Sequence, residues 1–250
     1  MRYLGGKSKI RKQVAQFLEG VRKDNQTYFE PFVGGGWVLQ EMSGKRKASD
    51  GNVALIAMYQ ALQQGWEPPD FVSEDEWRYW RKQKDAVAEP MMAFSRFGCG
   101  FGGDWMGGYA RSDGKTCYAA TSKRSLLKQL PKIKDVEFVQ GTFEQHHPVN
   151  CLIYCDPPYQ GTTAYGAFDS FNHILFWEIM REWGKHNTVV ISEYSAPEDF
   201  VCVKEMTSQM GLTTKQDTGT NERPKRVEKL FMHRSLVVNC GLLAILQNPV

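Results

Sequence analysis

The residues with the clearest chemical potential are Asp156-Pro157-Pro158-Tyr159, which directly follow the apolar run 152–155. The β-branched and aromatic residues of that run predict a buried strand, and proline cannot continue it because proline lacks the N–H and fixes φ. The chain must therefore leave the sheet at Asp156, on the edge where open α/β sheets bind ligands. The carboxylate and rigidly held carbonyls can accept hydrogen bonds from an exocyclic amine, and the tyrosine ring can stack on a flat heterocycle. The alternative is an ordinary strand-ending turn with an incidental acid.

A second chemical feature is the glycine loop 33–36, which lies between a predicted strand (27–32) and a predicted helix that opens with residues 37–42. A strand, a glycine loop and a helix form the usual cradle for a nucleotide, because glycines permit close approach and the helix offers unpaired N–H groups. The loop lacks the Lys-Ser/Thr of a phosphate loop and the Gly-x-Gly-x-x-Gly spacing of a dinucleotide fold. An adenosine ligand without phosphates fits it better.

Three further positions are candidate ligand contacts. The turn Gly5-Gly6-Lys7 combines close backbone approach with positive charge, although it could also be a basic tail. Asp50 ends a predicted second strand (45–50), where an acid usually holds a ribose diol, although it could be a turn residue before glycine. Phe143 follows a predicted strand (136–140) and could flank an adenine ring or belong to the core.

The remaining patterns complete an α/β fold. Helices are predicted over 10–21, 53–64, 74–84 and 173–183, and strands over 188–194 and 200–205. Residues 227–233 and 236–238 are predicted to form a closing pair of strands. Two polar loops, 160–169 and 215–226, are expected to fold over the site.

Residues 65–134 differ in composition from the rest of the chain. A Pro-Pro pair and a charged helix precede a glycine- and aromatic-rich stretch (94–111), and mostly basic residues follow. Such a surface suits phosphate tracking and insertion of side chains near bases, so we expect a DNA-recognition insertion between the catalytic segments 1–64 and 135–250. The alternative is a solvated helical hairpin with a glycine-rich loop. The candidate DNA contacts are Arg96, Arg111, Lys115, Lys123, Arg124 and Lys128.

Composition limits the remaining classes of function. The net charge of the 250 residues is only +3, which excludes a general polycation. The six cysteines show no Cys-x-x-Cys spacing, which favours reduced thiols in a cytoplasmic protein over a disulfide frame or a zinc site. His146-His147 lacks partner ligands, so no metal is expected. No signal peptide or membrane span is predicted.

Four pieces occur in a specific order: residues 2–7, the segment Glu30-Pro31-Phe32-Val33-Gly34-Gly35-Gly36, an insertion, and Asp156-Pro157-Pro158-Tyr159. This order resembles the Dam-like (D12 class, α-group) DNA adenine-N6 methyltransferases, many of which are phage-encoded. The resemblance runs over about residues 1–235. It implies a Rossmann-like S-adenosylmethionine-dependent methyltransferase sheet with an inserted, mainly helical DNA-recognition region.

The resemblance also implies an activity and a set of site residues. The activity is site-specific transfer of a methyl group from S-adenosyl-L-methionine to the N6 amine of a flipped-out adenine in double-stranded DNA. The expected setting is a monomer in the cytoplasm of a bacterial or phage-infected cell, with or without a partner restriction enzyme. Catalysis is assigned to Asp156, Pro157, Pro158 and Tyr159. Cofactor binding is assigned to Tyr3, Lys7, Glu30, Pro31, Phe32, Gly34, Gly35, Asp50, Phe143 and Asp156.

The sequence departs from the family pattern at two positions and leaves more than one function open. Tyr3 stands where the family usually has Trp, and Thr142 stands where an acid usually precedes the aromatic residue. N4-cytosine and protein-glutamine methyltransferases also use X-Pro-Pro-Tyr turns, but they favour Ser or Asn where this chain has Asp156. The chain could also be a non-catalytic DNA-binding protein that descends from a methyltransferase, or an enzyme with relaxed sequence specificity.

Overall fold

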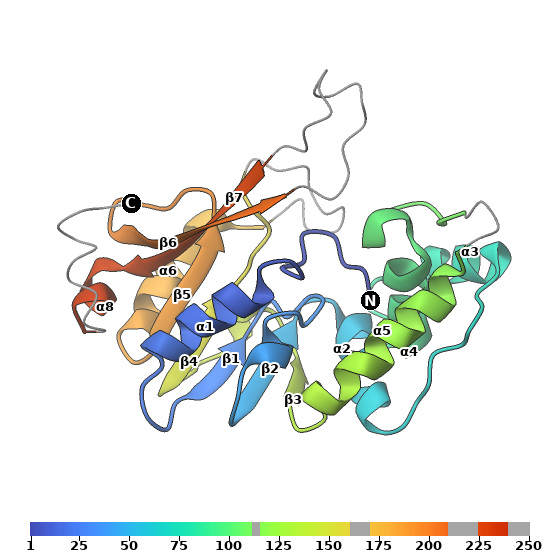
Figure 1. Cartoon of the computed structure of the whole chain (residues 1–250), viewed down its shortest axis with the longest axis horizontal. Helices are drawn as coiled ribbons and strands as arrows, with labels where there is room; N and C mark the ends of the chain where they lie inside the picture. Colours follow the sequence, from blue (N-terminus) through green and yellow to red (C-terminus); the bar gives the residue numbers. More distant parts are fainter. Residues whose placement is uncertain (112–115, 161–170, 210–224, 240–250) are drawn as a thin grey trace, which may run out of the picture.

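The computed structural model describes residues 1–111, 116–160, 171–209 and 225–239. These residues form one seven-stranded sheet in the order β3-β2-β1-β4-β5-β7-β6 (Figure 1). The strands are β1 (Thr27–Glu30), β2 (Arg46–Asp50), β3 (Glu137–Gln140), β4 (Cys151–Cys155), β5 (Thr188–Glu193), β6 (Phe200–Gln209) and β7 (Lys225–His233). The first five run parallel, and β7 lies antiparallel to both β5 and β6.

The central position of β4 and β5 follows from their residues. Every residue of β5 is buried, and Leu152 to Cys155 of β4 are 0% exposed. Such unbroken apolar runs suit parallel strands that are covered on both faces. The covering helices include α1 (Arg11–Val21), α2 (Val53–Gln63) and α6 (His173–Gly184), and α1 crosses in front of the sheet in Figure 1. Asparagine side chains cap α2 and α6, at Asn52 and Asn172.

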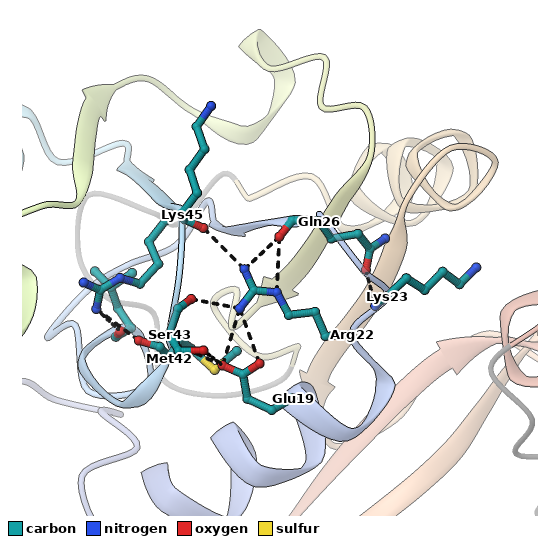
Figure 2. Close-up of polar contacts among 9 residues, drawn as sticks. Glu19, Arg22, Lys23, Gln26, Met42, Ser43 and Lys45 are labelled. Carbon is teal, nitrogen blue, oxygen red and sulfur yellow. Dashed lines mark hydrogen bonds and ion pairs between the residues drawn. The ribbon is translucent and has the colours of Figure 1, made fainter.

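The C-terminal end of α1 holds the turn before β2 (Figure 2). The Glu19 carboxylate accepts hydrogen bonds from the backbone N–H and the hydroxyl of Ser43, at 3.0 and 2.9 Å. The Arg22 guanidinium donates to the carbonyl oxygens of Ser43 and Gln26, at 2.8 and 2.7 Å. These contacts fix the start of β2 and therefore the place where Asp50 leaves the sheet.

The prediction of a helix that opens with residues 37–42 is wrong. The segment makes only a 3-10 turn, Leu39–Glu41, in which the Glu41 N–H donates to the Val38 carbonyl. Gly36 and Gly44 both have positive φ values, 62° and 68°, and the turn at Ser43 is held against α1. The positive φ values at both glycines and the anchored Ser43 interrupt helical geometry on each side of this turn.

The segment 65–134 is mainly helical and lies beside the sheet, on the right in Figure 1. It contains α3 (Glu74–Lys82), α4 (Pro90–Ala93), a π-helical turn (Phe94–Gly98), a 3-10 turn (Phe101–Gly103) and α5 (Tyr118–Ile133). Gln129 of α5 donates to the carbonyl oxygens of Gly35 and Gly36, at 3.1 and 2.9 Å. The Leu4 N–H donates to the Gly103 carbonyl at 3.0 Å. The segment therefore touches both the glycine loop and the N-terminal turn.

The closing part of the sheet also differs from expectation. β7 pairs with the long strand β6, whereas residues 236–238 lie in the helix α8 (Arg234–Asn239) and not in a strand. Leu236 and Val237 are both buried while Val238 is 47% exposed, and two adjacent buried residues fit a helix better than an alternating strand. The loop expected at 160–169 lies outside the described residues except for Gln160. The loop expected at 215–226 does so except for Lys225 and Arg226, which begin β7.

Candidate active site

A cavity of ≈ 300 Å³ lies at the carboxyl ends of β1, β2 and β4. Its walls come from the N-terminal turn, the glycine loop, the segment after β4 and the insertion. All of the residues assigned to catalysis or cofactor binding line it: Tyr3, Lys7, Glu30, Pro31, Phe32, Gly34, Gly35, Asp50, Phe143, Asp156, Pro157, Pro158 and Tyr159. Segments more than 150 positions apart in the sequence therefore meet in one hollow.

Asp156 directly follows β4, whose residues Leu152 to Cys155 are fully buried. The Tyr154 hydroxyl, 2.7 Å from the Ser192 hydroxyl, ties the end of β4 to β5. The Lys7 ammonium lies 2.7 Å from the Asp156 carboxylate and 3.6 Å from the carboxylate of Glu228 on β7. Burial raises the pKa of Asp156, while the Lys7 ammonium opposes this rise. Lys7 thus favours the ionised form, in which either oxygen can accept a hydrogen bond from an amine.

Tyr159 forms a fixed aromatic wall beside Asp156. Its hydroxyl donates to the Glu228 carboxylate at 2.8 Å, and the Tyr194 ring meets its ring edge-on at 4.8 Å between centroids. The Glu193 carboxylate accepts from the backbone N–H of Gln160 at 2.7 Å and so holds the end of the turn. The ring is 7% exposed, and it is therefore positioned before any ligand arrives.

Asp50 organises the glycine loop from the end of β2. Its two carboxylate oxygens accept from the backbone N–H groups of Gly34 and Asn52, each at 2.9 Å. Burial raises the pKa of Asp50 to about 6, although these two hydrogen bonds oppose the rise. Gly34 has a φ of 45°, and a Cβ at this position would lie 2.8 Å from the Tyr3 ring. Only glycine fits between the carboxylate and the ring.

Aromatic side chains form the apolar walls of the cavity. Phe32 and Phe143 lie 5.5 Å apart and both pack on Phe171, so Phe143 belongs to the core and lines the cavity as well. Sequence reasoning missed Trp37, whose ring would lie 2.8–2.9 Å from a Cβ on Gly35 or Gly6. Gly6 in the N-terminal turn and Gly35 in the glycine loop were the available signal, because a large ring can pack where a side chain is missing.

The sequence matches the model of the D12 class N6 adenine-specific DNA methyltransferase family over residues 3–89 and 109–209. The chain belongs to this family. The resemblance and the expected Rossmann-like S-adenosylmethionine-dependent methyltransferase fold are therefore confirmed. One solved structure that this chain matches is an rRNA methylase from Streptococcus thermophilus, at 10% identity and a TM-score of 0.37, over 88% of this chain and 94% of that chain. Comparison with curated proteins gave no match.

The residues predicted to contact DNA differ in exposure and in their ion-pair partners. Arg124 and Lys128 are exposed on α5, whereas Arg111 pairs with Glu74 and Lys123 pairs with Asp70. Lys115 lies outside the described residues.

Arg96 is buried, which is at odds with its prediction as a DNA contact. Its side chain is 3% exposed, and its guanidinium lies 2.7 Å from Asp85 and 3.7 Å from the centroid of the Trp105 ring. Its Nε also donates to the Trp105 carbonyl at 3.1 Å. The phenylalanines around Arg96 in the sequence were the signal for this burial, because they pack the same turn into the core. We therefore leave Arg96 out of the proposed DNA surface.

Metal ligands and membrane spans can be judged only for the described part of the chain. No group of three or more His, Cys, Asp or Glu side chains in it could hold a metal ion. No helix within these ranges is long and apolar enough to cross a membrane.

Proposed function

We propose that this chain transfers a methyl group from S-adenosyl-L-methionine to the N6 amine of adenine in double-stranded DNA, at a defined site. The observation that carries the proposal is the shared cavity. Its lining includes Asp156, which can accept from an amine, and Asp50 with the glycine loop, which can hold an adenosine. Family membership supports adenine in DNA as the methylated base.

The charges and the aromatic residues of the cavity lining support S-adenosylmethionine as the cofactor. Glu30, Asp50 and Asp156 are three carboxylates in the cavity lining, and they suit a ligand with two positive groups. Glu30 is 3% exposed, and burial, followed by the neighbouring Asp156 and Asp50, raises its pKa. The second lone pairs of the Asp50 oxygens can accept from a ribose diol, and the aromatic walls suit an adenine ring. The cofactor, when bound, supplies a methyl group on a positively charged sulfur.

The residues of the chain then have separate tasks in the transfer. The ionised Asp156 accepts one N6 proton and the Pro157 carbonyl accepts the other, so the nitrogen lone pair is localised as positive charge develops. The Tyr159 ring supports the base on one face. Because Asp156 and Tyr159 lie inside a cavity, an adenine within a stacked duplex cannot reach them, and we infer that the base is flipped out.

We further propose that residues 65–134 form the target-recognition region. Exposed Arg124 and Lys128 lie one helical turn apart on α5, a suitable arrangement for contact with DNA phosphates. Gln129 of the same helix holds the glycine loop, which would connect DNA contact to the cofactor side of the cavity. A monomer that acts in the cytoplasm of a bacterial or phage-infected cell, with or without a partner nuclease, completes the proposal.

Alanine variants of two arginines should separate DNA contact from folding. We expect Arg124→Ala to weaken DNA binding several-fold and to lower the salt dependence of log Kd by about one unit, with little change in stability. Arg96→Ala should instead lower the free energy of unfolding by about 1–2 kcal/mol, because it removes a buried guanidinium that stacks on Trp105 and pairs with the half-exposed Asp85. Fluorescence anisotropy with labelled duplex and urea unfolding measure the two effects. An unchanged salt dependence in Arg124→Ala would remove this residue from the proposed DNA surface.

The test of the function itself is methylation of unmethylated genomic DNA by the purified protein and S-adenosylmethionine, followed by base-resolution sequencing. N6-methyladenine in one short motif would support the whole proposal and give the target site. Methyladenine at most adenines would keep the chemistry and remove site specificity. Methylcytosine, or no methylated base with cofactor binding intact, would overturn the assignment of adenine.

A further inference from the structure

Lys7 occupies the carboxylate that the proposed reaction needs. Its ammonium lies 2.7 Å from Asp156 Oδ1, the distance of a direct charge-assisted hydrogen bond. The proposed substrate amine needs the same acceptor. Lys7 therefore competes with the amine of an arriving adenine for Asp156, although the two carboxylate oxygens can accept more than one hydrogen bond. The Lys7 side chain is 5% exposed, so an exchange of partner has to take place within the site.

Glu228 offers the ammonium a second partner at short range. Its Oε2 lies 3.6 Å from Lys7 Nζ, so a shift of about 1 Å would make a direct hydrogen bond of usual length. The four-carbon stem of lysine allows such a shift by rotation. The other neighbours of the ammonium, the Gly5 carbonyl at 3.4 Å and the Tyr159 ring at 4.7 Å, carry no charge. A buried ammonium without a charged partner is disfavoured, so Glu228 makes it easier for Lys7 to leave Asp156.

The position of Glu228 is fixed by the sheet. β7 is hydrogen-bonded to β5 on one side and to β6 on the other, where Glu228 is the register partner of Met206. The Glu228 side chain is 4% exposed and accepts from the Tyr159 hydroxyl at 2.8 Å. The neighbouring Glu193 is less suited to receive Lys7, because its oxygens accept from the backbone N–H groups of Gln160 and Tyr194, at 2.7 and 2.6 Å.

The exchange of partners also follows from the charges of Lys7, Asp156 and Glu228. In the resting site, one ammonium lies between two carboxylates, Asp156 and Glu228. Transfer of a methyl group to an amine creates positive charge next to Asp156. With Lys7 on Glu228, each carboxylate has one positive neighbour. With Lys7 still on Asp156, two positive groups would compete for one carboxylate.

We propose that Glu228 is a positioning residue that takes over the Lys7 ammonium when the target amine binds Asp156. This inference rests on the proposed function. Glu228 touches neither substrate nor cofactor in this scheme; it acts through Lys7 and keeps Tyr159 in place through the hydroxyl. No bond is made or broken in the exchange, and only the partner of one ammonium changes.

The test compares two duplexes built around the methylated site that sequencing identifies. One carries adenine at the target position, and the other carries purine, which lacks the exocyclic amine. We expect the unchanged protein with S-adenosylhomocysteine to bind the adenine duplex more tightly. Glu228→Gln keeps an acceptor for Tyr159 but loses the charge, and it should reduce the preference for adenine about 10-fold, the usual effect of losing a hydrogen bond between charged groups. Cofactor affinity should not change.

A double-mutant cycle with Lys7→Met separates this role from a structural one. If Glu228 acts by receiving Lys7, Glu228→Gln should have no further effect on the adenine preference once Lys7 is removed. An equal loss in both backgrounds would show that Glu228 acts through Tyr159 or the fold, and would overturn the inference, as would an unchanged preference in Glu228→Gln. Glu205→Gln, an acid on β6 outside the cavity, is the matched control. Absence of any methylated adenine with the unchanged protein would instead overturn the proposed function and the inference with it.

Discussion

Asp156→Ala is expected to lower the rate of methyl transfer at least about 1000-fold while the fold persists and the cofactor still binds, with reduced affinity, through Asp50 and the glycine loop. Removal of a group that strengthens its hydrogen bonds in the transition state typically has an effect of this order. The fold should persist because Lys7, the partner of Asp156, lies only 3.6 Å from Glu228 and so keeps a negative neighbour. The measurement is transfer of labelled methyl groups from S-adenosylmethionine to DNA, with cofactor affinity determined by calorimetry.

Two comparisons sharpen this prediction. Asp156→Asn keeps one acceptor oxygen and should retain a small residual rate above that of Asp156→Ala. Glu182→Ala removes an exposed carboxylate that pairs with Lys185 at the end of α6, outside the cavity lining, and it should leave the rate unchanged. An active Asp156→Ala protein would contradict the assigned role. Loss of both activity and cofactor binding would show that Asp156 acts mainly on the cofactor.

Asp50→Asn is expected to raise the Kd for S-adenosylmethionine about 10- to 100-fold. Both Asp50 oxygens accept from backbone N–H groups, and an amide in this position would turn its own NH2 toward one of those donors. The glycine loop would lose an anchor, and the ribose diol would lose a charged acceptor. Calorimetric titration of the variant measures the change, and Glu137→Gln, an exposed acid on β3, is the control.

The raised pKa of Asp50 makes both the stability of the fold and the affinity for the cofactor depend on pH. Its pKa of about 6 lies above the ordinary value of 3.8, so the folded chain keeps this proton to higher pH than the unfolded chain. The contribution of this group to stability is therefore full below pH 3.8 and is lost, by about 3 kcal/mol in total, as pH rises through about 6. Cofactor affinity should change in the opposite direction, since the ionised carboxylate is the better acceptor.

Comparison of the native chain with Asp50→Asn isolates this effect from the other acids. The difference in unfolding free energy between the two proteins should change between about pH 4 and about pH 7, and the rise in cofactor affinity over that range should be smaller in the variant. Urea unfolding and calorimetry at several pH values provide both curves. Parallel curves for the two proteins would show that Asp50 does not titrate in this window.

The sequence by itself determined the parallel strands of the sheet and part of the lining of the cavity. The apolar run before Asp156 located the end of β4 within one residue, because burial on both faces demands such a run and the prolines end it. The end of β2 at Asp50 was also predicted correctly, although its residues are mostly polar; the glycine that follows Asp50 was the signal. Parallel strands place their carboxyl ends on one edge, so the glycine loop, Asp50 and Asp156 had to meet there. To infer this meeting point, it was enough to locate the strand ends and to know that the carboxyl ends of parallel strands share one edge of a sheet.

Only the tertiary structure decided which side chains complete the site. Glu228 reaches Lys7 because β7 lies next to β5 in an antiparallel register, and Gln129 reaches the glycine loop because α5 packs beside it. Arg96 faces the interior, although it was predicted as a DNA contact within the glycine- and aromatic-rich stretch 94–111. In the pairs Lys7–Glu228 and Gln129–Gly35, the two residues are far apart in the sequence. Residue type and spacing indicate whether a segment forms a helix or a strand. The partner of a buried charge is instead set by how the elements pack against one another, because a charge left unpaired in the interior is costly.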